Sequence, residues 1–520
     1  MLIRCVKTVV ALAALALASA ALAAPDPGIA LVRTWCSGCH REAKPGQFER
    51  ISAIRKTPEG WVMTLFRMRQ VHHLMLPDEV HDAIVRHLAG AQGLAPSEAA
   101  PARFALERRP NVQDLDLGPE LGVMCGRCHS LARVALQRRD TDEWLKHMHF
   151  HVGQFPTLEY QASGRDRPWW QIASTQLPAE LGKRFPFTTG AWNDWQKQSH
   201  RNLAGRWIVV GHVAGGRDFY GSAEITREAG DSYHARYALN EAGGAPLGGE
   251  SRAIVYTGYE WRGRAALGGR AVREVYAANE DGSRIAGRWF DPDHSELGGE
   301  WTAIRADAAP EVLAVLPRAA RAGESRRVVV VGTGLAGAES AGFGAGTTTT
   351  VVHRDANVLE LDVAVAADAA PGARTLGAGA PAGQLIVFQQ IDQLDVRPAY
   401  GIARLGGGKV APVAAQFEAI ASTRLAGGEL ATLGPVAADW SAVPFDDEAR
   451  RTADDKYAGQ LDPTGRYLPA VAGPNPTREY SGDNVGNLAV VASVRDGARA
   501  LEGRGHLVVT VQRWISPPIY

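Results

Sequence analysis

The chain of 520 residues carries 56 basic and 56 acidic side chains, so its formal net charge is zero. This balance offers no broad positive surface, and we expect no nucleic acid as a partner. The length predicts three or four domains, and 57 glycines favour β structure over most of the chain.

Residues 1–24 have the features of a secretory signal peptide. Arg4 and Lys7 precede an apolar stretch, and small residues ending at Ala23 or Ala24 offer a cleavage site. The apolar stretch is too short for a stable transmembrane helix, and no later segment approaches the required length. We therefore expect an exported protein without a membrane span, located in a bacterial periplasm.

The remaining cysteines predict the cofactor. Cys5 is lost with the signal peptide, and the other four form two Cys-x-x-Cys pairs that are each followed by histidine. The two motifs are Cys36, Cys39 and His40, then Cys125, Cys128 and His129. In this motif the two thiols attach the haem vinyl groups and the adjacent imidazole binds the iron. Two disulfides would explain the cysteines of an exported protein but not the histidines, so we expect two covalently bound c-type haems.

A weak internal repeat indicates the second axial ligand of each haem. The segments "RKTPEGWVMTLFRM" and "RRDTDEWLKHMHFH" align with Trp61 on Trp144, and each contains a threonine followed by an acidic residue, which predicts a helix start. Met68 and His151 stand seven residues beyond the tryptophans, on the same face of each predicted helix. The predicted ligand pairs are His40 with Met68 and His129 with His151.

Several nearby side chains compete for these two positions. For the first haem they are His72, His73 and Met75, and for the second they are His147, Met148 and His149. A methionine ligand raises the reduction potential relative to two histidines. The predicted ligands would therefore hold the two haems at different potentials and give the electron flow a direction.

The sequence pattern changes near residue 196. Residues 25–195 predict an α-helical dihaem cytochrome c domain, with helices over 61–69 and 77–90. Residues 196–308 alternate apolar and polar side chains, with a turn at Asp281-Gly282, and predict an antiparallel β-barrel filled by its own side chains. Recurrent Gly-Arg-Trp and Gly-Glu-Trp triplets are interpreted as strand starts.

A glycine-rich segment of the third domain imitates a dinucleotide-binding site. The stretch "VVVVGTGLAG" (328–337) has the spacing of that fingerprint, but glycines and β-branched residues follow where an amphipathic helix is required. We interpret the valines as a buried strand. Short strands and frequent turns predict two immunoglobulin-like β-sandwiches, over 309–394 and 395–520, with a polar loop at 451–469 in the second.

This arrangement, a dihaem cytochrome c followed by three mainly antiparallel β domains, resembles the α subunit of quinohaemoprotein amine dehydrogenase. The resemblance covers essentially the whole mature chain. The residues that carry it are "WCSGCH", "TPEGW", "RM" (67–68), "HLAGAQGLAP", "CGRCHSLARV", "HVGQFPTLEYQ" and "GRW". The haem motifs are generic, but their combination with "GQFPTLEYQ" and the β domains is specific.

The resemblance implies an enzyme of three different subunits. A propeller-like β subunit and a small γ subunit would join this chain, and the γ subunit would carry a cysteine tryptophylquinone that converts primary amines to aldehyde and ammonia. This chain has no spare cysteine for such a quinone, so it would hold no catalytic residue of the amine reaction. Its two haems would pass electrons from the quinone to a soluble copper protein or cytochrome c.

Two other functions are compatible with the sequence. A dihaem peroxidase also has two c-type haems, with an open or displaceable axial position, although three β domains are unexpected for it. A non-catalytic electron carrier would use the β domains to bind another periplasmic protein. A high-spin haem signal would favour the peroxidase, and failure to associate with a quinone-bearing chain would favour the carrier.

Overall fold

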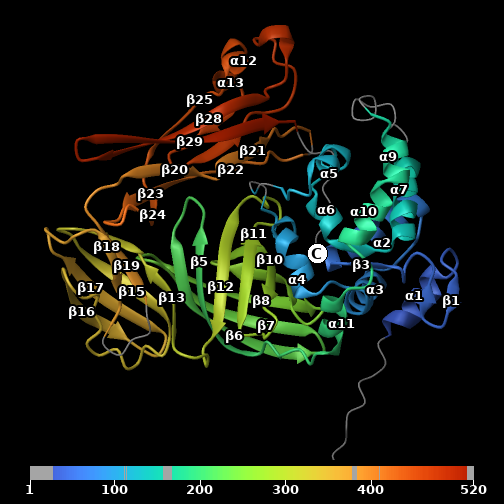
Figure 1. Cartoon of the computed structure of the whole chain (residues 1–520), viewed down its shortest axis with the longest axis horizontal. Helices are drawn as coiled ribbons and strands as arrows, with labels where there is room; N and C mark the ends of the chain where they lie inside the picture. The colour runs from blue at the N-terminus through green and yellow to red at the C-terminus, as the bar shows by residue number, and fades with distance from the viewer. Residues whose placement is uncertain are drawn as a thin grey trace, which may run out of the picture.

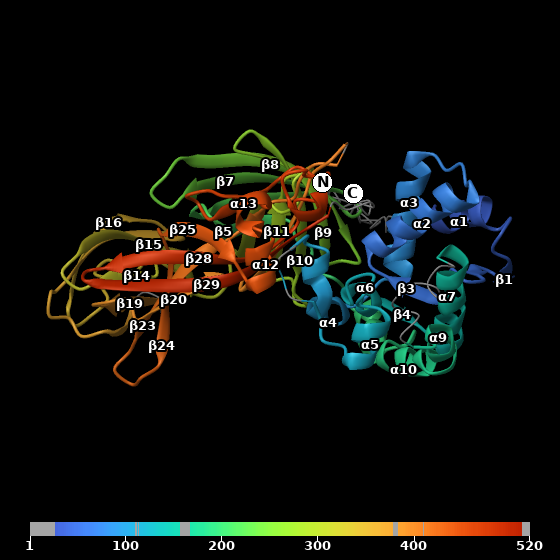
Figure 2. The ribbon, with the colours of Figure 1, turned by 90° about the horizontal axis from the view of Figure 1, so that it is seen from above.

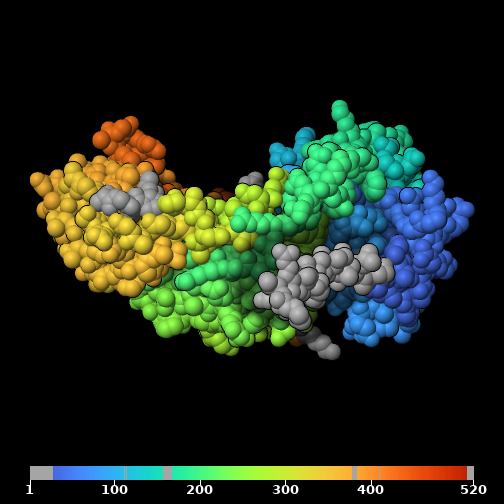
Figure 3. Space-filling model, turned by 90° about the horizontal axis from the view of Figure 1, so that it is seen from below, coloured from blue at the N-terminus to red at the C-terminus, as the bar shows by residue number. Residues whose placement is uncertain are grey.

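The computed structural model describes residues 27–109, 112, 114–155, 167–377, 383–408 and 410–511. The predicted signal peptide, part of "GQFPTLEYQ" and residues 512–520 of the last predicted sandwich lie outside these ranges. Figure 1 shows a helical region at one end, a β-barrel in the middle and two sheet-rich regions beyond it, and Figure 3 shows the barrel between the two ends on the molecular surface. Within the described ranges, no helix is both long and apolar enough to cross a membrane.

The described residues between 27 and 197 form helices connected by short strands. The helices are α1 (Gly28–Cys36), α2 (Pro58–His72), α3 (Asp78–Ala91), α4 (Pro96–Ala99), η1 (Ala100–Ala105), α5 (Pro119–Met124), α6 (Ala132–Ala135), α7 (Thr141–Gln154), α9 (Trp169–Thr175), α10 (Leu177–Arg184) and α11 (Gly190–Lys197). The strands are β1 (Glu42–Lys44), β2 (Gln47–Phe48), β3 (Ile54–Lys56) and β4 (Gln137–Arg139). The helices α2 and α3 occupy the positions predicted at 61–69 and 77–90.

The internal repeat corresponds to two halves that meet at one two-stranded ribbon. Strand β3 precedes α2 and strand β4 precedes α7, and the two strands pair antiparallel with Arg55 opposite Arg138. Figure 2 shows α1, α2 and α3 on one side of this ribbon and α7, α9 and α10 on the other. Trp61 and Trp144 are each 1% exposed, in separate cores. The aligned tryptophans therefore hold equivalent positions in two packed halves.

The two long helices of the halves begin at equivalent residues. Thr57 caps α2 by accepting a hydrogen bond from the N–H of Gly60, as predicted. Helix α7 is capped by Asp140, whose carboxylate accepts the N–H of Glu143 at 2.7 Å, so the cap lies one residue before the predicted Thr141. Aspartate and threonine are both effective caps, and Asp140 is the residue that aligns with Thr57 in the repeat.

The second region is a closed antiparallel barrel, as predicted, in which sequential strands pair and the last pairs with the first. Its strands are β5 (Gly205–Val213), β6 (Asp218–Ala229), β7 (Ser232–Glu241), β8 (Pro246–Tyr256), β9 (Glu260–Leu267), β10 (Arg270–Ala278), β11 (Arg284–Phe290) and β12 (Gly298–Arg305). Asp281-Gly282 lies between β10 and β11, as expected. Gly287 does not start a strand, contrary to our interpretation: inside β11, a Cβ there would approach the carbonyl oxygen of Val275 to 2.2 Å.

Aromatic side chains fill the barrel. Trp207, Trp261 and Tyr276 are at most 1% exposed within its core. The same core includes Trp192 and Trp195 of α11, the last helix before the barrel. Helix α11 therefore packs into the hydrophobic core of the barrel.

The third region contains two small sheets around one core, with strand orders β13-β15-β17-β16 and β14-β19-β18. Its strands are β13 (Glu311–Leu316), β14 (Ala319–Arg321), β15 (Ser325–Thr333), β16 (Thr347–Arg354), β17 (Val358–Val365), β18 (Gly372–Thr375) and β19 (Gln384–Phe388). All pairs are antiparallel except β14 with β19. The valines of "VVVVGTGLAG" lie in β15, as predicted, and turns without a helix connect β15 to β16.

The fourth region contains three sheets, ordered β20-β23-β24, β21-β29-β28-β25 and β22-β27-β26. Its strands are β20 (Gln393–Arg397), β21 (Tyr400–Arg404), β22 (Ala415–Gln416), β23 (Glu418–Arg424), β24 (Leu430–Val436), β25 (Asp439–Pro444), β26 (Gly459–Leu461), β27 (Arg466–Pro469), β28 (Gly486–Asp496) and β29 (Arg499–Thr510). The polar loop predicted at 451–469 is wrong, because α13 (Asp454–Tyr457), β26 and β27 occupy it. Asp454 orders the segment: it is 5% exposed and binds Arg478 and the N–H of Asn487.

Candidate functional site

The first Cys-x-x-Cys-His motif forms a tight turn at the end of α1. The N–H groups of Cys39 and His40 donate to the carbonyl of Cys36 at 3.1 and 2.8 Å. Both thiols are free; Cys36 is buried, and Cys39 is exposed. Burial, followed by the neighbouring Cys39, raises the pKa of Cys36 to about 11. His40 Nδ1 lies 3.0 Å from the carbonyl oxygen of Glu49. Because a carbonyl only accepts, Nδ1 carries the proton and Nε2 keeps its lone pair for a metal.

The second motif repeats this arrangement after α5. The N–H groups of Cys128 and His129 donate to the carbonyl of Cys125 at 3.1 and 3.3 Å. The thiols are again free, with Cys125 half-buried and Cys128 exposed. His129 Nδ1 lies 2.9 Å from the carbonyl oxygen of Ser130, so its Nε2 also keeps the lone pair. Both motifs therefore present two thiols and one imidazole in the tautomer that a metal requires.

The structure brings His151 of α7 opposite His129. The centroids of the two rings are 6.4 Å apart and their planes differ by 36°. Two imidazoles on opposite sides of one metal ion, each with a nitrogen about 2 Å from it, have centroids about 6 Å apart. His151 Nδ1 lies 2.8 Å from the carbonyl oxygen of His147, which again leaves Nε2 as the lone-pair nitrogen. Burial lowers the pKa of both imidazoles and favours the neutral form that binds iron. The pair fits a haem iron between the two rings.

The three competing side chains on α7 have other surroundings. Met148 is 4% exposed and packs with Trp144 in the core of the second half. His147 is stacked on Phe150, and its ring meets that of His151 edge-on with the centroids 4.7 Å apart. The ring of His149 meets that of Trp170 edge-on with the centroids 4.8 Å apart. Of the four candidates on this helix, His151 is the one whose ring has a recorded contact with His129.

At the first motif the structure records no comparable pair among the described residues. Met68 lies on α2 with a partly buried side chain, and its carbonyl accepts the N–H groups of His73 and Leu74 at the end of the helix. His72 and His73 are exposed, and Met75 is 82% exposed beside a cavity of about 430 Å³. Of the two predicted ligands of the first haem, His40 is therefore the one that a contact of its side chain supports, through Nδ1 and the carbonyl of Glu49.

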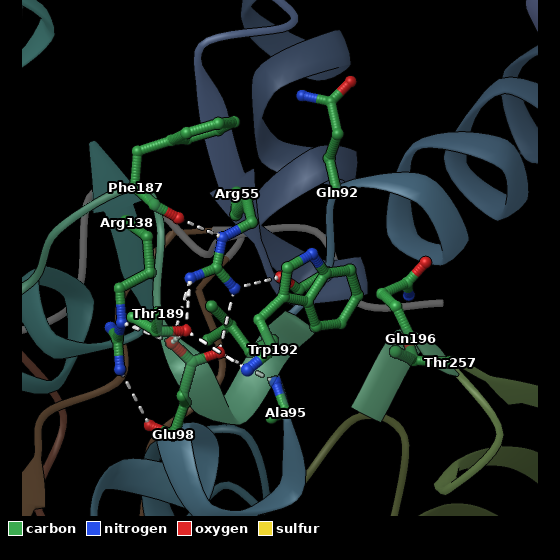
Figure 4. Close-up of polar contacts among 12 residues, drawn as sticks. Arg55, Gln92, Ala95, Glu98, Arg138, Phe187, Thr189, Trp192, Gln196 and Thr257 are labelled. Carbon is green, nitrogen blue, oxygen red and sulfur yellow. Dashed lines mark hydrogen bonds and ion pairs between the residues drawn. The ribbon is translucent and has the colours of Figure 1, made fainter. Parts of the chain in front are cut away.

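A buried ion network joins the two strands of the ribbon (Figure 4). Arg55 of β3 donates two hydrogen bonds to the carboxylate of Glu98, at 2.9 and 3.0 Å, and Arg138 of β4 donates a third at 3.0 Å. Thr189 donates to the same carboxylate at 2.9 Å, and Arg55 also reaches the carbonyl of Phe187. Burial alone would raise the pKa of Glu98, but the two arginines lower it. Glu98 therefore remains a carboxylate that clamps both strands of the ribbon.

Sequence analysis missed this network and a set of basic residues near it. Lys56 and Arg139 are also equivalent in the repeat, and both are buried on the ribbon. The signal was present in the aligned segments, where "RK" precedes the cap Thr57 and "RR" precedes the cap Asp140. A lysine or arginine in a strand is usually an exposed residue, so the pattern alone did not indicate burial.

Four family models match consecutive parts of the chain. They are described as the quinohemoprotein amine dehydrogenase alpha subunit haem-binding domain, over residues 27–192, and as alpha subunit domains II, III and IV, over 200–306, 309–389 and 394–519. The chain belongs to the quinohemoprotein amine dehydrogenase alpha-subunit family. This confirms the family predicted from the haem motifs and the β domains, and it makes the chain a subunit of an oxidoreductase with a haem-binding domain.

Other comparisons add no further assignment for this amine dehydrogenase subunit. No curated protein matches it. A solved structure of a redesigned β-barrel, mFAP1, bound to DFHBI, is 15% identical with a TM-score of 0.17, over 19% of this chain and 91% of that one. The Bacteroides ovatus mixed-linkage glucan utilization locus protein SGBP-B, in complex with a heptasaccharide, is 11% identical with a TM-score of 0.18, over 60% and 64%. Scores this low carry no argument.

Proposed function

We propose that this alpha subunit is the electron-transfer subunit of its amine dehydrogenase and carries two covalently bound c-type haems. The observation that carries the proposal is the pair of similar motifs, each with two free thiols and a histidine whose Nδ1 faces a backbone carbonyl. The facing rings of His129 and His151 support a six-coordinate iron at the second motif. Bound haem supplies a one-electron carrier at each site.

Each predicted site residue has a distinct role in this proposal. Cys36 and Cys39 would attach the first haem, and His40 and Met68 would bind its iron. Cys125 and Cys128 would attach the second haem, and His129 and His151 would bind its iron.

The amine chemistry belongs to a partner. Of the five cysteines in the chain, Cys5 lies in the predicted signal peptide and the other four belong to the haem motifs, so none is left to form a quinone cross-link. A small γ subunit with cysteine tryptophylquinone would oxidise the primary amine, and a propeller-like β subunit would complete the heterotrimer. The haems would deliver the electrons to a soluble copper protein or cytochrome c in the periplasm.

The same proposal includes an immunoglobulin-like character for the last two regions. Residues 309–394 and 395–520 would each be a sandwich of that class. The packing of separate small sheets around a common core in each region supports this.

The proposal is tested on the native complex, purified from periplasm by its haem colour. Anaerobic addition of butylamine should reduce the haems, with a small quinone-bearing chain in the same preparation. Triethylamine, which has no N–H to form an imine with a quinone, is the matched control and should leave the haems oxidised. A preparation with two haems per chain that butylamine does not reduce, and without a quinone-bearing chain, would contradict the proposal; reaction with peroxide at a high-spin haem would then indicate a peroxidase.

A further inference from the structure

The ribbon of β3 and β4 carries basic residues on both of its faces. Opposed residues of an antiparallel pair share a face, so Arg55 and Arg138 point to one side, where Glu98 binds both. Lys56 and Arg139 alternate with them and belong to the opposite face. The basic residues on both faces are buried, but Glu98 binds only the arginines of the first face.

The second face forms part of a larger group, which we call the cationic cluster: Lys56, Arg67, Arg133 and Arg139. Lys56 Nζ donates to Thr64 Oγ1 at 2.8 Å, and a guanidinium nitrogen of Arg67 donates to the same hydroxyl at 3.3 Å. Arg133 of α6 reaches the sulfur of Met63 on α2 at 3.3 Å, which brings the two halves together. Arg139 Nε donates to the amide oxygen of Gln137 at 3.1 Å, and Lys56, Arg67 and Arg139 each lie over an aromatic ring.

The cationic cluster has little negative charge beside it in the described part of the chain. Arg67 Nε and Arg139 Nη1 are buried and have no hydrogen-bond partner there. The carboxylate of Glu143 comes within 4.0 Å of Arg139, but it accepts hydrogen bonds from Arg50 at 2.9 Å and Lys146 at 2.6 Å. Burial lowers the pKa of Arg139 to about 9, although the charge of Glu143 opposes this shift, and burial together with the charge of Arg133 lowers the pKa of Arg67 to about 10. Burying cations without partners is costly, so the site requires an anion.

The cluster adjoins the second haem site and reaches the helix of the first. The guanidinium of Arg67 lies 5.3 Å from the ring of Phe150, which contacts His151. His147, beside His151, has its pKa lowered by burial and then by the charge of Arg139. Arg67 is on α2, next to Met68. An anion in this place would lie between the two haem sites.

We propose that the cationic cluster binds the propionate carboxylates of the haems. A haem carries two propionates, and an arginine guanidinium binds a carboxylate through a pair of parallel hydrogen bonds. Their carboxylates satisfy the unpartnered Arg67 and Arg139 atoms and balance the cations. Because oxidised haem has one more positive charge than reduced haem, the cluster favours the reduced state and raises the potential. This inference rests on the proposed binding of two haems.

The test uses the holoprotein and four variants. Arg139→Gln and Arg67→Gln each remove one cation, and each should change the ratio of reduced to oxidised haem at a fixed potential by about tenfold towards the oxidised form, which is 59 mV for one electron. The haem at His129 should shift most. Arg138→Gln removes an equally buried arginine on the Glu98 face of the same strand; it should lower thermal stability and change that ratio less than about threefold. Arg67→Lys, which keeps the charge, should retain most of the wild-type potential.

The outcomes separate the two proposals. Fewer than two haems in the wild-type holoprotein, counted from its haem absorption after denaturation, would contradict the proposed function itself. Two haems with unchanged potentials in Arg67→Gln and Arg139→Gln would overturn the propionate assignment alone. If Arg139→Gln does not accumulate, the test is made on Arg67→Gln by its redox-induced infrared difference spectrum. Carboxylate bands identical to those of the wild type would overturn the assignment, and shifted carboxylate bands would support it.

Discussion

At the scale of single residues, backbone carbonyls fix the tautomer of the three histidines that are predicted to bind iron. His40, His129 and His151 each place Nδ1 within 3.0 Å of a carbonyl oxygen, from Glu49, Ser130 and His147. The spacing of Cys-x-x-Cys-His predicts which imidazole follows the thiols. It does not predict the acceptor, because Glu49 lies nine residues from His40, beyond the strands β1 and β2. The fixed tautomer is therefore a property of the fold.

Substitution of the predicted distal ligands should affect one haem at a time. His151→Ala should convert the haem at His129 to a high-spin or weakly ligated form and leave the other spectrum intact, whereas Met68→Ala should change only the haem at His40. Magnetic circular dichroism and electron paramagnetic resonance resolve the two. Met148→Leu, a volume-conserving change in the same core, is the control and should leave both spectra unchanged. Unaltered spectra in His151→Ala would transfer the role to His147 or His149.

At the scale of elements, the apolar periodicity predicted which helices and strands exist better than it predicted where they begin and end. The helices around Trp61 and Trp144 and the antiparallel barrel could be derived from apolar spacing and turn signals. The cap at Asp140, the mid-strand position of Gly287 and the ordered segment 451–469 could not. The cap at Asp140 is a local contact with Glu143, and residue type alone does not decide between Asp140 and Thr141. The other two features depend on partners distant in sequence: β11 packs against Val275 of β10, and Asp454 is ordered by Arg478 and Asn487. Local composition holds no information about such partners.

The caps provide an element-scale prediction. Asp140→Ala removes the acceptor for the Glu143 N–H and should destabilise α7 by about 1 kcal/mol. Haem absorption during urea unfolding reports this loss, because α7 carries His151. Asp140→Ser keeps a side-chain acceptor and should recover most of the stability. Asp142→Ala, in the same first turn but not at the cap, is the control; an equal loss in that variant would show that charge near the helix N-terminus, and not the cap, is responsible.

At the scale of the whole molecule, the regions are joined by contacts that no local pattern predicts. His212 of the barrel lies 2.8 Å from Asp218 of β6 and 2.8 Å from Glu418 of β23, which is 206 positions further along the chain. Burial alone would lower the pKa of His212, but the hydrogen bonds that its imidazole donates to these two carboxylates, and their negative charges, raise the pKa to about 10. The histidine is therefore charged at neutral pH and links the barrel to the fourth region.

This contact should weaken as the pH rises. The pKa of a histidine in an unfolded chain is about 6.5, so the folded state holds the proton more tightly and the stabilisation is complete below that pH. It declines progressively towards pH 10. The difference in melting temperature between the wild type and His212→Gln should therefore shrink between pH 6.5 and 10. His234→Gln, which affects only an ion pair within the barrel, is the control. A difference that stays constant with pH would show that His212 contributes by packing alone.

The antiparallel pairing of β3 with β4 places Arg55 directly opposite Arg138, its equivalent in the repeat. In a symmetric dimer, a residue lies opposite the same residue of the other copy only at the two-fold axis. The ribbon therefore has the geometry of an interface between two copies of a single-haem ancestor. In such a homodimer the two arginines would repel each other across the axis. Glu98 lies in the segment that joins the two halves, and there a single carboxylate can serve both arginines. Fusion of the copies would thus convert a repulsive contact into a bound ion triad and fix the spacing of the two electron carriers.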